Sequence, residues 1–136
     1  MSTKFPGINI QWPWSELILR GLKTIETRRY RIPEKHIGSP LVLIETPGPR
    51  GKTEAGFSKA RAIAIITFSG CYLYPSKRSW ENEFSKHRVP EDDLLYGFKP
   101  NEDKWAWIIS SVKPLKNTHS VPRNRGIVFT KPINLS

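Results

Sequence analysis

Hydrophobic and polar residues alternate in several short stretches of this 136-residue chain, and a period of two is typical of β-strands. Two apolar runs bounded by proline and glycine are typical of central strands. Together these patterns predict five or six strands. The stretches are GINIQ (7–11), KTIETRRYRI (23–32), PLVLIET (40–46), ARAIAIITFSGCYLY (60–74), KWAWIISSVKPL (104–115) and RGIVFTKP (125–132).

Helical spacing occurs in shorter segments between these strands. In PWSELILRG (13–21) the apolar positions recur at helical intervals, Pro13 suits the first turn, and Gly21 suits the residue after the last turn. PSKRSWENEFSKH (75–87) offers Ser76 as an N-terminal cap, and PEDDLLYGF (90–98) opens with proline and acidic residues, as helices often do. The sequence therefore predicts two or three short helices.

The order of these elements predicts the fold class. Few helical crossovers and irregular connections favour an α+β domain with a small, mixed, partly closed β-barrel over a doubly wound sheet. The length suits a single domain spanning 1–136. The segment PGPRGKTEAGFSK (47–59) has no hydrophobic period, and we expect a mobile loop with Arg50 and Lys52 at a positive tip.

Composition adds a strong charge signal. The formal net charge is +10, and an excess of lysine and arginine in a small domain favours nucleic acid as the partner. The two ends of the chain carry most of it, with Arg123 and Arg125 near the C-terminus. A generally basic surface that serves solubility is the alternative.

Other classes of protein find little support in the composition. No apolar run reaches the roughly 18 residues of a membrane span, and no secretory signal is evident, so we expect a cytoplasmic protein. One cysteine, Cys71, and three scattered histidines give no metal-ligand spacing. We expect neither a metal nor another cofactor, and Cys71 suits a small buried apolar position.

The segment GLKTIETRR (21–29) carries the candidate chemistry. Residues two apart on a strand share a face, so Glu26 and Arg28 are neighbours, and Lys23 at the helix-to-strand junction can reach the same side. A guanidinium fork, a carboxylate and an ammonium together can hold a planar polar ligand. An exposed ion pair of little energetic value is the alternative.

The same segment resembles a known family. PWSELILRGLKTIETRRY is similar to the opening signature of the ASCH domain, one of the small β-barrels named after pseudouridine synthase and archaeosine transglycosylase (PUA). That signature joins a proline and an aromatic residue, a short helix ending in glycine, and G-x-K-x-x-E-x-R. WAWIISSVKPL and VPRNRGIVF resemble the family's closing strands more loosely. The matching residues are Pro13, Trp14, Gly21, Lys23, Glu26 and Arg28.

The resemblance implies a cleft beside the barrel that accepts RNA or a nucleotide, with the charged residues as its floor. Trp12 stands where the family usually has glutamine, and Glu26 stands where some related acetylcytidine hydrolases carry threonine, with Thr24 and Thr27 on either side. Tryptophans beside Pro13 can stack on a base. The candidate ligand-binding residues are Trp12, Trp14, Lys23, Thr24, Glu26, Arg28, Arg29, Tyr30, Arg50, Lys52, Arg123 and Arg125.

Three functions fit these residues. The first is an RNA- or nucleotide-binding module in which Lys23 and Arg28 contact phosphate or a base edge and Glu26 accepts from an exocyclic amine. The second is a hydrolase, either a ribonuclease or an acetylated-cytidine amidohydrolase, with Lys23 and Glu26 as catalytic residues. The third, a protein-interaction domain, is least favoured because no large apolar stripe lies outside the predicted core.

Overall fold

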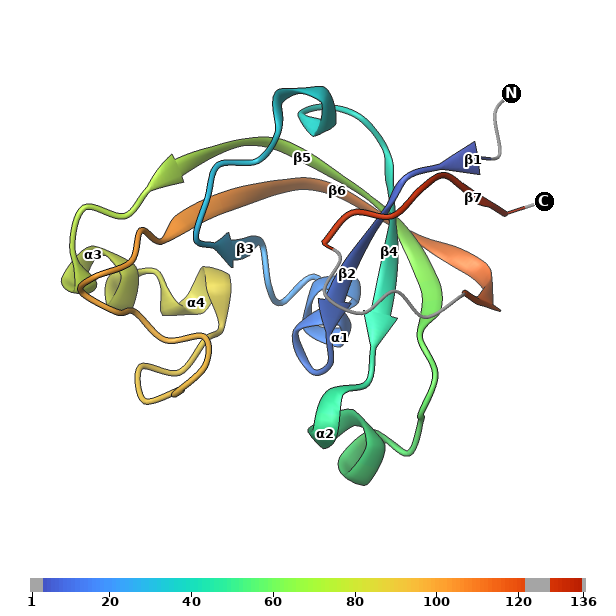
Figure 1. The fold of residues 1–136 in the computed structure, drawn as a ribbon, viewed down its shortest axis with the longest axis horizontal. Helices are drawn as coiled ribbons and strands as arrows, with labels where there is room; N and C mark the ends of the chain where they lie inside the picture. Colours follow the sequence, from blue (N-terminus) through green and yellow to red (C-terminus); the bar gives the residue numbers. More distant parts are fainter. Residues whose placement is uncertain (1–3, 122–127, 136) are drawn as a thin grey trace.

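A five-stranded sheet, in the order β2-β4-β5-β6-β3, dominates this computed structural model, which describes residues 4–121 and 128–135 (Figure 1). β2 and β4 pair in parallel, and the other neighbours pair antiparallel. A second sheet pairs β1 with β7. The strands are β1 (Lys4–Phe5), β2 (Gly7–Gln11), β3 (Ile25–Arg28), β4 (Leu41–Thr46), β5 (Arg61–Leu73), β6 (Trp105–Ser120) and β7 (Ile133–Asn134).

The sheet curves but does not close. β2 and β3 form its two edges, so the predicted α+β class with a partly closed barrel is confirmed. Several register shifts interrupt the pairing of β5 with β6, and such irregularities increase the local twist and bend of a strand. Figure 1 shows β5 and β6 as long curved strands.

Short helical segments lie between the strands. Helix α1 begins directly after Pro13, as predicted, and Gly21 follows it with a φ of +75°, which glycine adopts without strain. The predicted cap Ser76 accepts a hydrogen bond from the Ser79 N–H at the start of α3. In the described residues these segments are α1 (Trp14–Leu19), η1 (Glu34–His36), α2 (Gly48–Arg50), η2 (Gly51–Ala55), α3 (Lys77–Asn82) and α4 (Phe84–His87).

The prediction of a mobile loop at 47–59 is wrong in its first half. Helix α2 runs into the π-helical turn η2, and Gly56 ends the turn with a φ of +73°. A local hydrogen bond of 2.9 Å from Arg50 to Glu54, four residues on, supports the turn. This hydrogen bond joins residues one helical turn apart, so it supports helical backbone in a segment whose glycine and proline residues disfavour a helix.

The helix predicted at 90–98 does not form. Instead, the carboxylate of Asp93 accepts hydrogen bonds from the N–H groups of Leu95 (3.0 Å) and Tyr96 (2.7 Å). Aspartate competes with helical hydrogen bonding in this way, so the acidic cluster makes a turn. The last strand, β7, also lies later than predicted. Phe129 makes only an isolated bridge to Ile8, and residues 125–127 of the predicted strand lie outside the described residues.

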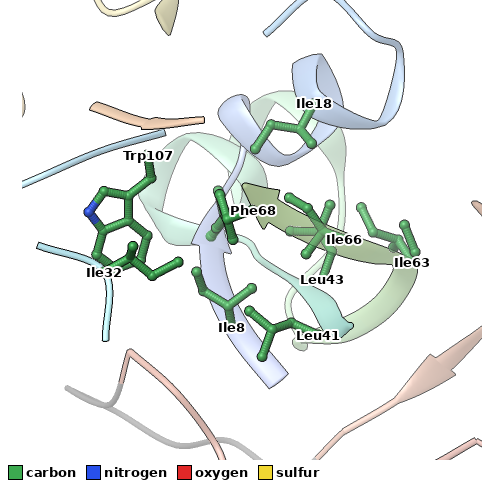
Figure 2. Close-up of a cluster of buried hydrophobic side chains, with 11 residues drawn as sticks. Ile8, Ile18, Ile32, Leu41, Leu43, Ile63, Ile66, Phe68 and Trp107 are labelled. Atoms are coloured by element: carbon green, nitrogen blue, oxygen red, sulfur yellow. The ribbon is translucent and has the colours of Figure 1, made fainter. Parts of the chain in front are cut away.

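The main core lies between the inner face of the sheet and α1. Figure 2 shows Ile8 of β2, Leu43 of β4 and Ile66 of β5 packed together, with Ile18 of α1 beside them and Trp107 of β6 at the edge of the cluster. All five side chains are buried. The apolar runs predicted as central strands therefore build the core, and the Trp107 indole donates from it to the Tyr30 carbonyl, two residues after the end of β3.

Candidate functional site

Three charged side chains meet at the start of β3, and we call Lys23, Glu26 and Arg28 the charge cluster. Lys23 Nζ lies 3.4 Å from Glu26 Oε1, and Arg28 Nη2 lies 2.8 Å from Glu26 Oε2. The side chains of Lys23, Glu26 and Arg28 are 0%, 9% and 19% exposed, respectively. The cluster is therefore a shielded arrangement and not a surface ion pair.

The local fold explains why these residues converge. The chain turns after α1, where the N–H groups of Leu22 and Lys23 both donate to the carbonyl of Leu17. β3 begins two residues later and pairs with β6, which places Glu26 opposite Trp107. Alternation along β3 then puts Glu26 and Arg28 on one face, as the sequence predicts.

Arg28 also bridges the two edges of the open sheet. Its Nη2 donates to the carbonyl of Asn9 in β2 at 3.1 Å, and its guanidinium lies 5.7 Å from the ring centre of Trp107. Because β2 and β3 are not paired, this side chain spans the seam between them. The charge cluster thus lies where the barrel is open.

Burial and charge act against each other on the pKa values of the cluster. Burial lowers the pKa of Lys23 to about 8, although Glu26 opposes the shift. Burial alone would raise the pKa of Glu26, but Arg28 and Lys23 outweigh it and hold that pKa below its usual value. Glu26 is therefore a carboxylate at neutral pH.

His87 helps to fix the lysine. Lys23 Nζ donates to the His87 carbonyl at 2.5 Å, and the neighbouring N–H of Thr24 donates to the carbonyl of Lys86. The His87 ring is buried, with Val89 N–H donating to Nδ1, so Nε2 donates to the Trp80 carbonyl at 2.7 Å. Burial lowers the pKa of His87 to about 4, which keeps this ring neutral.

The charge cluster lines a cavity of about 540 Å³, referred to below simply as the cavity. Five lysine or arginine residues and two glutamates line it, together with three aromatic residues. Its surroundings therefore favour an anionic, aromatic ligand. The lining residues are Asn9, Ile10, Gln11, Trp14, Lys23, Glu26, Thr27, Arg28, Arg29, Tyr30, Thr46, Val89, Leu95, Tyr96, Lys99, Glu102, Lys104 and Val128.

One wall of the cavity comes from residues that the sequence reasoning missed. The Tyr96 hydroxyl donates to Gln11 Oε1 at 2.6 Å, and its ring meets Trp14 edge-on at 4.9 Å. Lys104 is buried and donates to the Tyr96 carbonyl at 2.9 Å. Burial lowers the pKa of Lys104. The mix of aspartate, tyrosine and glycine in DDLLYG (92–97) is typical of such a turn, although the preceding proline and the acidic residues also suit the start of a helix.

The structure distributes the remaining predicted residues differently. Trp14, Arg29 and Tyr30 line the cavity. Trp12 does not, because its indole donates to Glu16 and its ring lies under Arg50 at 5.6 Å. Thr24, Arg50 and Lys52 are exposed and also do not line it. Arg123 and Arg125 lie outside the described residues.

Two further findings concern the described part of the chain only. No group of three or more His, Cys, Asp or Glu side chains in residues 4–121 and 128–135 could hold a metal ion. Within the same ranges, no helix has the length and apolar character needed to cross a bilayer.

Comparison with known proteins identifies the fold. No protein-family model matches the chain, and no curated protein sequence matches it. The crystal structure of the ASCH protein of Zymomonas mobilis superposes with a TM-score of 0.61 at 17% identity, over 96% of this chain and 73% of that chain. A serine-to-alanine mutant of that protein gives 0.61 at 18% identity, over 98% and 76%. A tyrosine-to-phenylalanine mutant gives 0.60 at 17%, over 96% and 75%. The seam, the cavity and the charge cluster therefore belong to a chain with an ASCH-like fold, which confirms the predicted resemblance.

Proposed function

We propose that the protein binds RNA or a nucleotide, with one base held in the cavity. The observation that carries this proposal is the shielded contact of Glu26 with both Lys23 and Arg28, at the floor of a concave space lined by further cations and aromatic rings. A volume of about 540 Å³ lies within the range of about 300–1,000 Å³ that is usual for small-ligand sites. It suits one nucleotide better than a longer strand.

The floor offers a hydrogen-bonding pattern for a base edge. In the described residues both hydrogen bonds of Arg28 are donated by Nη2, so Nε and Nη1 are the atoms that can donate to a base. Each oxygen of Glu26 contacts one cation and keeps a second lone pair for an exocyclic amine. Lys23 is fully buried, so its role is to hold the carboxylate charged and in place.

The walls and rim fit the rest of a nucleotide. Trp14, Tyr30 and Tyr96 offer ring faces or edges to a base. Arg29 and Lys99 line the same cavity and can neutralise phosphate, whereas a phosphate beside Glu26 would be repelled. The proposed orientation therefore places the base at the floor and the phosphate near the rim.

Binding of a short single-stranded RNA and of the four nucleoside monophosphates, followed by fluorescence anisotropy and calorimetry, tests the proposal. We expect the RNA affinity to fall steeply as salt rises, because basic contacts release counterions. Arg28→Lys keeps the charge but loses the planar fork, and we expect about tenfold weaker binding. Arg78→Lys, on the exposed surface of α3, is the matched control and should change affinity by less than about twofold.

An affinity that is insensitive to salt, or equal losses in the two variants, would overturn the proposal. Absence of binding to every probe would do the same.

One observation favours a second candidate, hydrolysis of acetylated cytidine or of RNA. A lysine whose pKa lies at about 8 is poised for proton transfer near neutral pH. However, the buried Lys23 ammonium already donates to the His87 carbonyl and contacts Glu26, so two of its three donors are engaged before any substrate binds. Incubation with acetylated cytidine and with short RNA, analysed by chromatography, separates the two candidates, since a binding module leaves both substrates unchanged.

A further inference from the structure

Two leucines stand out on the surface beside the cavity. Leu94 is 89% exposed and Leu95 is 74% exposed, the highest values among the exposed large hydrophobic residues of the described chain. Leu95 also lines the cavity. Single exposed leucines are common, but two adjacent ones, one of which lines a charged cavity, call for an explanation.

The backbone that carries these leucines is well fixed. Asp93 accepts hydrogen bonds from the N–H groups of Leu95 and Tyr96, and its own carbonyl accepts from Gly97 N–H at 2.9 Å. The Tyr96 hydroxyl ties the turn to Gln11 in β2. The leucines are therefore presented on a fixed turn, and a pre-formed contact surface loses little entropy on binding.

The chemistry around the turn points to a nucleic acid. Lys99 follows five residues after Leu94 and lines the cavity with Arg29, on a chain whose net charge is +10. A protein partner for such a rim would need acidic groups, whereas a nucleic acid offers both phosphates and apolar base faces. Proteins that kink or open nucleic acid often insert leucine or a similar apolar side chain between base steps.

Extrusion of a base makes three demands on a protein. It needs a pocket for the base, cations for the flanking phosphates, and a group that fills the gap in the stack, because unstacking costs a few kcal/mol. The cavity and its rim cations answer the first two demands under the proposed function. The exposed leucines are apolar and lie beside the cavity, so they can fill the gap that the extruded base leaves in the stack.

We infer that Leu94 and Leu95 form an apolar wedge that takes the place of one base in a stacked strand while that base occupies the cavity. The inference rests on the proposed function, and it identifies the partner as an RNA with an unpaired or weakly paired base inside a stacked helix. Leu94 enters the stack, and Leu95 closes the cavity mouth behind the extruded base.

Three probes test the wedge by anisotropy and calorimetry: a short RNA duplex with a single unpaired adenosine, the same duplex fully paired, and adenosine monophosphate. We expect the wild-type protein to prefer the duplex with the unpaired adenosine by about tenfold, because the wedge then pays no unpairing cost. Leu94→Ser should remove this preference and leave the affinity for adenosine monophosphate unchanged, because Leu94 does not line the cavity. Leu94→Met should retain the preference, since methionine can also insert.

Leu73→Ser is the matched control, because Leu73 is exposed at the end of β5 and does not line the cavity. It should leave all three affinities as they are. The wedge is overturned if Leu94→Ser keeps the preference, or if the wild type shows none. It is also overturned if wild-type protein dimerises in light scattering and Leu94→Ser abolishes the dimer, since the leucines then serve a protein contact. If the wild-type protein does not bind adenosine monophosphate at all, the result counts against the proposed function and not against the wedge alone.

Discussion

Two carboxylates in this protein pair with arginine at nearly the same distance but in opposite surroundings. Glu26 contacts Arg28 at 2.8 Å and also Lys23, with 9% of its side chain exposed. Glu54 contacts Arg50 at 2.9 Å on the surface of the helical turn, with 50% of its side chain exposed. The sequence marks both places as basic candidates for a ligand site, yet only the first lines the cavity.

The difference shows that charge alone does not place an ion pair at the cavity. The pKa of each carboxyl is lowered, but for Glu54 the main cause is the hydrogen bond from Arg50, whereas for Glu26 two cations must overcome the effect of burial. A shielded carboxylate has few alternative partners, so its geometry is fixed. An exposed pair exchanges freely with water and contributes little.

The sharpest way to break this comparison is to remove one charge from each pair. Glu26→Gln leaves Lys23 and Arg28 without their counter-ion in a shielded place, and we expect the free energy of unfolding to fall by about 3–5 kcal/mol. Glu54→Gln is the matched control and should leave the urea midpoint within experimental error of the wild type. Urea titrations with unchanged slopes measure both effects. Equal midpoints for the two variants would show that the shielded carboxylate of Glu26 contributes no more to stability than the exposed one of Glu54.

A second test uses the titration of the buried lysine. Its folded pKa, about 8, lies below the usual lysine value of 10.5, so between these pH values Lys23 is protonated more fully in the unfolded chain than in the folded protein. Stability must then rise with pH across this window, because unfolding takes up protons there. The contribution of Lys23 is at most on the order of 3 kcal/mol.

The variant Lys23→Met should flatten this rise, whereas Lys52→Met, at the exposed turn, should retain it. Unfolding by guanidinium chloride at a series of pH values across the window provides the measurement. A rise of the same size in Lys23→Met would assign the titration to other groups, Lys104 first among them, since burial lowers its pKa too.

Local rules of sequence predicted which charged side chains lie together, although they left an exposed ion pair open as the alternative. The cap glycine at Gly21 and the period of two in β3 fix the relative positions of Lys23, Glu26 and Arg28 within a few residues. The buried runs of β4 and β5 were equally clear, because continuous apolar stretches have few alternatives to a core strand. These features depend only on near neighbours in the chain.

The rest of the cavity depends on contacts between distant residues. His87 is 64 positions away from the lysine that it holds, and Tyr96 is 85 positions away from Gln11. The spacing of apolar residues does not predict contacts between positions so far apart in the sequence. Such contacts follow only once the register of β3 on β6 and the turn at Asp93 are known. Arg50 and Lys52 are the opposite case, because the basic residues of this Gly-Pro segment were predicted to bind the ligand, and the fold keeps them out of the cavity lining.

The cavity wall at Tyr96 is an intermediate case, and it gives the smallest predicted effect. Tyr96 as a residue is 40% exposed, but its hydroxyl donates to Gln11 Oε1 at 2.6 Å. Tyr96→Phe removes this one hydrogen bond and should lower the free energy of local opening by about 1 kcal/mol. We expect faster hydrogen exchange at the Leu95 and Tyr96 amides, with little change in global stability.

The matched control for that wall is Tyr72→Phe, which removes a hydroxyl whose partner is Glu83, away from the cavity lining. It should leave the exchange of the Leu95 and Tyr96 amides unchanged. If Tyr96→Phe also leaves them unchanged, then Asp93 alone holds the turn, because its carboxylate accepts from both amides. If Tyr96→Phe lowers the free energy of global unfolding as much as Glu26→Gln does, the hydrogen bond from Tyr96 to Gln11 stabilises the whole fold. The half-exposed wall then behaves like the shielded charge cluster.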